Sequence, residues 1–87
     1  MVTGYVRHKV ADFQKWKTVY DAHDAARKQF GCLKSEVFVN ASNPLEVLVI
    51  NEWSSKADAA KFDESSNLKE AMKHAGVSSV PEFTFAE

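Results

Sequence analysis

The stretch "LEVLVINEW", residues 45–53, decides the fold, because it reads as a β-strand that is apolar on both faces. Successive side chains of a strand point to opposite faces. The apolar side chains therefore divide into two sets, with Leu45, Val47 and Val49 on one face and Leu48 and Ile50 on the other. A small antiparallel sheet usually leaves one face to water. The stretch thus predicts that a second surface covers the face that the chain's own helices do not.

Length and charge limit what this chain can be. With 87 residues and a net charge of -1, we expect one domain over residues 1–87 and no nucleic-acid partner, since nucleic acid selects a basic surface. No apolar segment approaches the ~18 residues of a membrane span, and no signal-peptide pattern is present. Cys32 is the only cysteine, which excludes a disulfide framework. These features predict a cytoplasmic protein with no membrane partner.

Strand and helix patterns alternate along the chain. Period-two alternation predicts strands, and apolar residues at three-and-four spacing predict helices. The expected elements, in order, are a strand over 2–10, a helix from Asp12 to about Phe30, strands over 32–40 and 45–53, a helix from Ser55 interrupted at 64–67, and a strand over 80–87. The order βαββαβ predicts an α+β, ferredoxin-like fold with a four-stranded antiparallel sheet. Right-handed crossovers then place the first and third strands in the middle and both helices on one face.

Helix ends are marked by specific residues. Asp12 is expected to be the N-cap of the first helix, because its carboxylate can accept hydrogen bonds from the free amides of the first turn. Ser55 with Asp58 resembles a capping box, and Asn67 with Glu70 offers a cap for the resumed helix. Gly31 and Gly76 are expected to end the two helices in a left-handed conformation.

The uncovered sheet face predicts self-association. Either Leu48 and Ile50 or the opposite set, Leu45, Val47 and Val49, would lie bare there, and apolar area favours association at ~25 cal/mol per Å². We therefore expect a homodimer, most simply with two-fold symmetry. Arg7 would lie on this face and would need a carboxylate such as Glu46 or Glu52.

Much catalytic chemistry has no counterpart in the sequence. It contains no phosphate loop, no dinucleotide fingerprint, no HExxH motif and no nucleophile elbow. The histidines, His8, His23 and His74, lie on different elements without ligand spacing. We therefore predict no metal site and no cofactor.

Two residues of the first helix are candidates for a ligand pocket. His23 is either a neutral core imidazole bonded to backbone or a general base, since its ordinary pKa lies near neutrality. Tyr20, one turn earlier, is either core or a ligand contact.

Three strand residues could likewise be either structural or part of a ligand pocket. Asn51 costs free energy in an apolar run unless its amide is paired. The Asn51 amide either pairs with backbone groups or binds a carbonyl or phenolate of a flat ligand. Trp53, two residues later on the same face, either fills the end of the sheet or contacts the ligand ring. His8 shares a face with apolar valines, and a shift of one residue in register would move it to the other face.

The chain resembles the dimeric α/β-barrel superfamily, and within it the antibiotic biosynthesis monooxygenase-like branch. The resemblance rests on "NEWSSKADAAKF" (51–62) and "LKEAMKHAGVSSVPEFTF" (68–85), most specifically Glu52-Trp53-Ser54 and Ala75-Gly76-Val77 with Pro81. It implies a sheet-on-sheet homodimer that forms one barrel. Members of this family include cofactor-free oxygenases of aromatic compounds that use Asn, Trp, Tyr and Arg. By residue type, Asn51, Trp53, Tyr20 and His23 would serve here.

The haem-degrading branch differs from this chain. It implies an Asn on the first strand, a second Trp and a haem-ligating His, whereas residues 2–10 lack Asn and the other two positions hold Phe62 and Met72. We therefore place Phe62 and Met72 among the apolar substrate contacts.

Together these features predict a homodimer with an apolar pocket between sheet and helices. The first hypothesis is a cofactor-independent monooxygenase of aromatic, quinol- or polyketide-like compounds, with catalytic Asn51 and His23 and substrate-binding residues Trp53, Tyr20, His8, Phe62 and Met72. The alternative is a non-catalytic, ligand-binding or stress-associated dimer that uses the same pocket.

Overall fold

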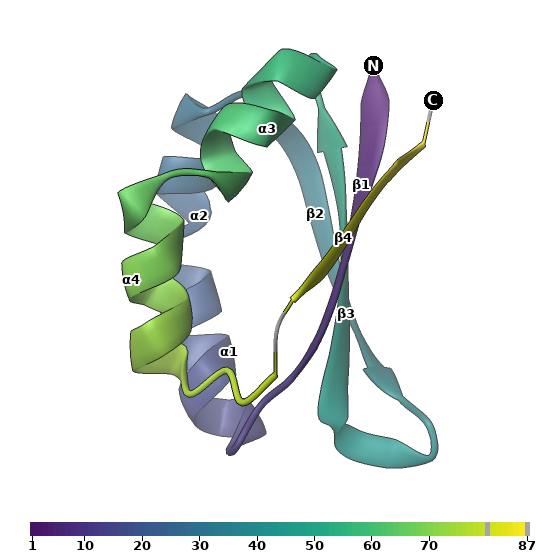
Figure 1. The fold of residues 1–87 in the computed structure, drawn as a ribbon, viewed down its shortest axis with the longest axis vertical. Helices are drawn as coiled ribbons and strands as arrows, with labels where there is room; N and C mark the ends of the chain where they lie inside the picture. Colours follow the sequence, from purple (N-terminus) through teal and green to yellow (C-terminus); the bar gives the residue numbers. More distant parts are fainter. Residues whose placement is uncertain (80, 87) are drawn as a thin grey trace.

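The computed structural model describes residues 1–79 and 81–86, without the side chain of Asn67. The described part folds into two layers, a twisted antiparallel sheet and a layer of helices on one of its faces (Figure 1). The elements are β1 (Val2–Lys9), α1 (Phe13–Ala22), α2 (Asp24–Gln29), β2 (Cys32–Asn40), β3 (Asn43–Trp53), α3 (Lys56–Asp63), α4 (Ser66–Ala75) and β4 (Glu82–Ala86). The strand order β2-β3-β1-β4 confirms the predicted ferredoxin-like α+β fold, with β1 and β3 in the middle.

The register of β1 against β3 decides which side chains face the helices. Val6 pairs with Val49 and His8 with Val47, and since paired residues share a face, all four side chains lie beneath the helices. Val47 is 0% exposed and Val49 5%. The prediction that β3 is apolar on both faces is confirmed.

The other face of the sheet carries no helix (Figure 1). Leu48 and Ile50 lie there partly buried, beside Tyr5 and Phe38, which pair with Ile50 and Leu48 and are 37% and 47% exposed. Arg7 lies on the same face. Its Nη2 donates to Glu82 at 3.0 Å, and its Nε lies 3.8 Å from Glu46. Of the two predicted carboxylate partners, Glu46 is therefore present and Glu52 is not.

Two apolar clusters fill the space between sheet and helices. One gathers at the start of β1 and the end of β3 and consists of Val2, Cys32, Trp53, Ala59 and Phe62. The other lies towards the opposite end and consists of Val6, Val10, Trp16, Val47, Val49 and Ala75. We call them the Trp53 cluster and the Trp16 cluster.

The caps of the first two predicted helices form as expected. Asp12 accepts from the Lys15 amide at 3.2 Å, and Ser55 accepts from the Asp58 amide at 3.1 Å. The helix predicted to continue to Phe30 is interrupted at His23, whose ψ of 8° lies outside the helical range and divides α1 from α2. No Gly or Pro marks this break in the sequence.

The later boundaries need small corrections. The N-cap of α4 is Ser65, whose hydroxyl accepts from the Leu68 amide, and not Asn67. Gly31 and Gly76 have φ values of 97° and 76°, as predicted for the ends of helices. Residues 80 and 87, the two ends of the predicted last strand, lie outside the described residues.

Two other strand ends also differ from the predicted ones. β1 ends at Lys9, and Val10 forms an isolated bridge to Val77, while β3 begins two residues early, at Asn43. Of the described helices, none has the length and apolar character needed to cross a membrane.

Candidate functional site

A cavity of about 70 Å³ lies between the sheet and the helices, beside the Trp16 cluster. Most of its wall is apolar. Val6 and Val49 come from the sheet, and α4 contributes Leu68, Ala71 and Met72. The volume is well below the ~300–1,000 Å³ of common ligand pockets. A bound ring therefore requires movement of half-buried side chains such as Met72.

Two polar side chains of the sheet project into this apolar cavity. His8 and Asn51 are each 4% exposed. Among the described residues, neither ring nitrogen of His8 nor Oδ1 of Asn51 has a hydrogen-bond partner. Burial lowers the pKa of His8, so the ring is neutral near pH 7 and offers one N–H donor and one acceptor nitrogen. The structure thus places His8 on the helix-covered face, where its ring lies 5.5 Å from that of Trp16.

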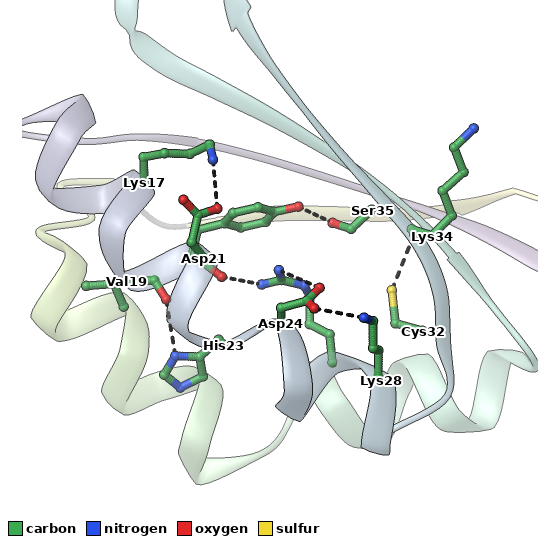
Figure 2. A network of polar contacts seen from close by, with 11 residues as sticks. Lys17, Val19, Asp21, His23, Asp24, Lys28, Cys32, Lys34 and Ser35 are labelled. Atoms are coloured by element: carbon green, nitrogen blue, oxygen red, sulfur yellow. Dashed lines mark hydrogen bonds and ion pairs between the residues drawn. The ribbon is translucent and has the colours of Figure 1, made fainter.

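Tyr20 forms a wall of the cavity through stacking and hydrogen bonds. Its ring stacks on Trp16 at a centroid distance of 5.1 Å, and the Arg27 guanidinium carbon lies 3.9 Å from the Tyr20 centroid. The Tyr20 hydroxyl is hydrogen-bonded to Ser35 of β2 (Figure 2). These contacts hold the phenol ring in place across the gap from helix to sheet.

Arg27 is a buried cation that the sequence analysis did not single out. It is 6% exposed, donates from Nη1 to the Tyr20 carbonyl at 2.9 Å and lies 3.7 Å from the Asp24 carboxylate (Figure 2). Its Nε has no partner among the described residues. The signal was present in the sequence, because Arg27 stands four residues after His23 and seven after Tyr20, on the same helical stripe.

His23 also lines the cavity, from the break between α1 and α2. Its Nδ1 lies 3.3 Å from the Val19 carbonyl oxygen (Figure 2). When Nδ1 carries the proton and donates to this oxygen, Nε2 remains as an acceptor. The geometry therefore fits an imidazole that is bonded to backbone through one nitrogen and lines the cavity.

Asp63, the last residue of α3, is the second site residue that the sequence analysis missed. It is half-buried and lines the cavity. Burial, and to a smaller extent the Glu64 carboxylate, raises the pKa of Asp63 to about 6. The sequence holds no signal for this, because the burial of a helix-end carboxylate depends on which elements surround it in the fold.

The cavity brings together all of the predicted site residues except Trp53. Its lining includes His8, Tyr20, His23, Asn51, Phe62 and Met72. Trp53 is 1% exposed in its own cluster, where its ring lies 5.2 Å from that of Phe62. It supports the cavity wall through Phe62 and does not line the cavity.

A larger, more polar cleft of about 360 Å³ shares Tyr20 and Arg27 with the cavity. Asp24 and Lys28 line it and pair with each other at 2.9 Å (Figure 2). Cys32 also lines it, and burial raises the pKa of its thiol. Within residues 1–79 and 81–86, no group of three or more His, Cys, Asp or Glu side chains is arranged to hold a metal ion.

Solved structures with the same fold cover nearly the whole chain. SnoaB, a cofactor-independent oxygenase from Streptomyces nogalater, superposes with a TM-score of 0.79 at 13% identity, over 99% of this chain and 90% of SnoaB. A conserved protein from Methanosarcina mazei gives a TM-score of 0.79 at 14% identity, over 99% of this chain and 90% of that one. An antibiotic biosynthesis monooxygenase gives 0.76 at 14% identity, over 100% and 97%. At these identities the likeness establishes the fold.

No curated protein matches the sequence significantly. The sequence model described as "Antibiotic biosynthesis monooxygenase" matches residues 2–74, which is most of the chain and includes every predicted site residue. The resemblance inferred from the residues is thereby confirmed. The chain belongs to the antibiotic biosynthesis monooxygenase family.

Proposed function

We propose that this protein is a cofactor-independent monooxygenase of small aromatic compounds that carry a phenolic or enolic hydroxyl. One observation carries the proposal. Asn51 Oδ1 and both nitrogens of His8 are buried in an apolar cavity without partners among the described residues. Leaving such groups unpaired costs ~1–3 kcal/mol each, which a ligand hydroxyl would recover.

The donors and acceptors of these groups define the ligand. Asn51 Oδ1 accepts only, so its partner is an O–H or N–H donor. The neutral His8 ring, which lies four residues along the sheet from Asn51, offers one donor and one acceptor to another part of the same ligand.

Ionisation of the ligand hydroxyl is the next step. Once the hydroxyl has lost its proton, the Asn51 amide can turn its Nδ2–H₂ group toward the negative oxygen, and the charge spreads onto ring carbon. Such a carbanion-like carbon reacts with O₂. In an anthrone, the CH₂ carbon becomes C=O, one oxygen atom enters the product, and the other leaves as water with the two hydrogens of that carbon. His23 contacts the reacting ligand through its acceptor nitrogen Nε2, and Tyr20 completes the wall around the ring.

The similarity of the fold to SnoaB supports this reaction class, and the small cavity limits ligand size. Phe83 of β4 lines the cavity and is 38% exposed. Together with Met72 it can move to admit a flat ring.

Oxygen uptake tests the proposal. With anthrone as the probe, EDTA present and no flavin added, the protein should consume O₂ above the protein-free rate and form anthraquinone. Asn51→Ala and His23→Ala should each lower the rate roughly 10- to 100-fold, as expected for ~1–3 kcal/mol of lost transition-state contact. Asn40→Ala, at the exposed end of β2, is the matched control and should retain the rate.

Two results would overturn the assignment. Unchanged turnover in folded Asn51→Ala and His23→Ala variants would exclude these residues from the chemistry. Anthrone binding without oxygen uptake would favour the alternative function, a non-catalytic ligand-binding dimer.

We also propose that the protein is a homodimer that pairs the open sheet faces. Leu48 and Ile50 at the centre of this face, with Tyr5 and Phe38 beside them, form an apolar patch without helical cover. Arg7, Glu46 and Glu82 form a charged edge that would fix the orientation. Sedimentation should give the mass of two chains, and Leu48→Lys should give the mass of one. A monomeric wild-type protein would contradict the dimer.

A further inference from the structure

We propose that Asp63 is the proton acceptor of the cavity, taking the hydroxyl proton of the phenolic or enolic ligand directly or through one water molecule. The inference rests on the proposed function for the class of ligand. It adds a residue that neither the sequence analysis nor the family resemblance assigned.

The position of Asp63 supports this role. It ends α3 directly after Phe62, and both residues line the cavity. The neighbouring wall from α4 is apolar, through Leu68 and Met72. Asn51 lines the same cavity, so the Asp63 carboxylate and the hydroxyl-binding Asn51 amide can contact the same molecule.

The charges around Asp63 leave its carboxylate free to take a proton. Among the described residues it forms no salt bridge, in contrast to Asp24 and Asp21, which pair with Lys28 and Lys17. The other ionisable groups of the cavity are His8 on β1, Tyr20 and His23 at the α1 side, and Arg27 on α2. Glu64, next along the chain, adds negative charge and favours protonation of Asp63.

The proton balance is simple. The ligand O–H bond breaks, its electron pair stays on oxygen, and the carboxylate becomes a carboxylic acid. The raised proton affinity of Asp63 brings it closer to that of a phenol than an exposed Asp would be, which is the condition for efficient proton transfer near neutral pH. The ligand then carries the negative charge that Asp63 has given up.

Proton linkage on ligand binding tests the inference without requiring turnover. The probe is 4-nitrophenol, titrated into the protein by calorimetry in two buffers of different ionisation enthalpy, at a pH where the probe is already ionised in water. Two negative charges in one small cavity are unfavourable. The wild-type protein should therefore take up about one proton per probe bound.

Asp63→Asn should abolish the proton uptake and should bind the anion roughly 10-fold more tightly, because the like charge is gone. Asp63→Ser is a second variant that also removes the charge. Asp21→Asn, a paired and exposed carboxylate, is the matched control and should behave like the wild type.

Other results of the titration overturn the inference. Uptake that persists in the Asp63 variants places the proton elsewhere. A wild-type protein that binds the probe without proton uptake, or does not bind it, excludes the acceptor role. Proton uptake that depends on Asp63, combined with absent oxygen consumption, would retain this inference and overturn only the oxygenase function.

Discussion

The two tryptophans lie in regions of the core that are built differently. The Trp53 cluster consists of apolar side chains, and its indole is 1% exposed against Val2, Cys32 and Phe62. The Trp16 cluster borders a cavity, and its indole contacts the His8 and Tyr20 rings. Both regions lie under the same helical layer, on the same two central strands.

The difference between the two clusters indicates which part of the core serves stability and which part serves function. The Trp53 cluster buries apolar area and contains none of the unpartnered buried atoms found among the described residues. Around the Trp16 cluster, His8, Arg27 and Asn51 leave buried polar atoms unpaired. Such groups lower stability, and natural proteins retain them mainly where they serve a function.

The largest expected effect comes from breaking the Trp53 cluster. Trp53→Ala should lower the free energy of unfolding by ~3–5 kcal/mol, because it removes a fully buried indole and leaves a cavity. Urea denaturation followed by circular dichroism measures this. Leu33→Ala, at a site 58% exposed, should change stability by less than ~0.5 kcal/mol. A small loss of unfolding free energy in Trp53→Ala would show that this cluster is not the tightly packed part of the core.

The next effect has the opposite sign. His8→Leu should raise the free energy of unfolding by roughly 1–2 kcal/mol at pH 7, since two unpartnered nitrogens are replaced by methyl groups in an apolar site. Because burial lowers the pKa of His8, the folded state binds fewer protons than the unfolded state. Wild-type stability therefore falls through this group as pH drops below its ordinary pKa, and His8→Leu removes that part of the fall. A destabilised His8→Leu protein would mean that His8 is satisfied in the fold.

The smallest effect concerns Asp63. Its pKa rises from 3.8 to about 6 in the folded state, so the folded protein binds the proton more tightly, and this contribution to stability is lost as pH rises from 4 to 6. Because the side chain is half-exposed, solvent screening reduces the cost of the ionised form to about 1 kcal/mol above pH 6.

Asp63→Asn should therefore stabilise the protein by that amount at pH 7 and leave it unchanged near pH 3. Thermal unfolding of both proteins at the two pH values measures the difference. Equal stability at pH 7 would indicate that the Asp63 carboxylate is fully solvated.

The sequence predicted the architecture well, for identifiable reasons. The alternation of Val2, Val6 and Val10 and the apolar run at 45–53 predicted the strands β1 and β3. The order βαββαβ with right-handed crossovers predicted that these two strands lie in the middle of the sheet. The helix caps at Asp12 and Ser55 could be predicted from the sequence, since a cap depends on residues three apart in the chain. The break at His23 was not, because neither Gly nor Pro marks it.

The lining of the cavity was predicted in part. Tyr20 and His23 were expected there because they stand on one helical stripe, and Asn51 because a polar residue interrupts an apolar strand. Trp53 was expected to touch the ligand, yet it faces Phe62 in a separate cluster. Arg27 was overlooked although it continues the stripe of Tyr20 and His23, and Asp63 had no local signal.

The sequence by itself thus determined the order of elements, the central strands, the apolar open face and the family. These follow from local periodicity and short-range capping, which are written in consecutive residues. Only the tertiary structure decided that His8 faces the helices, that Arg27 lies over the Tyr20 ring and that Asp63 lines the same cavity as Asn51. These facts depend on strand register and on helix-to-helix packing, which bring together residues far apart in the chain, and no local pattern encodes them.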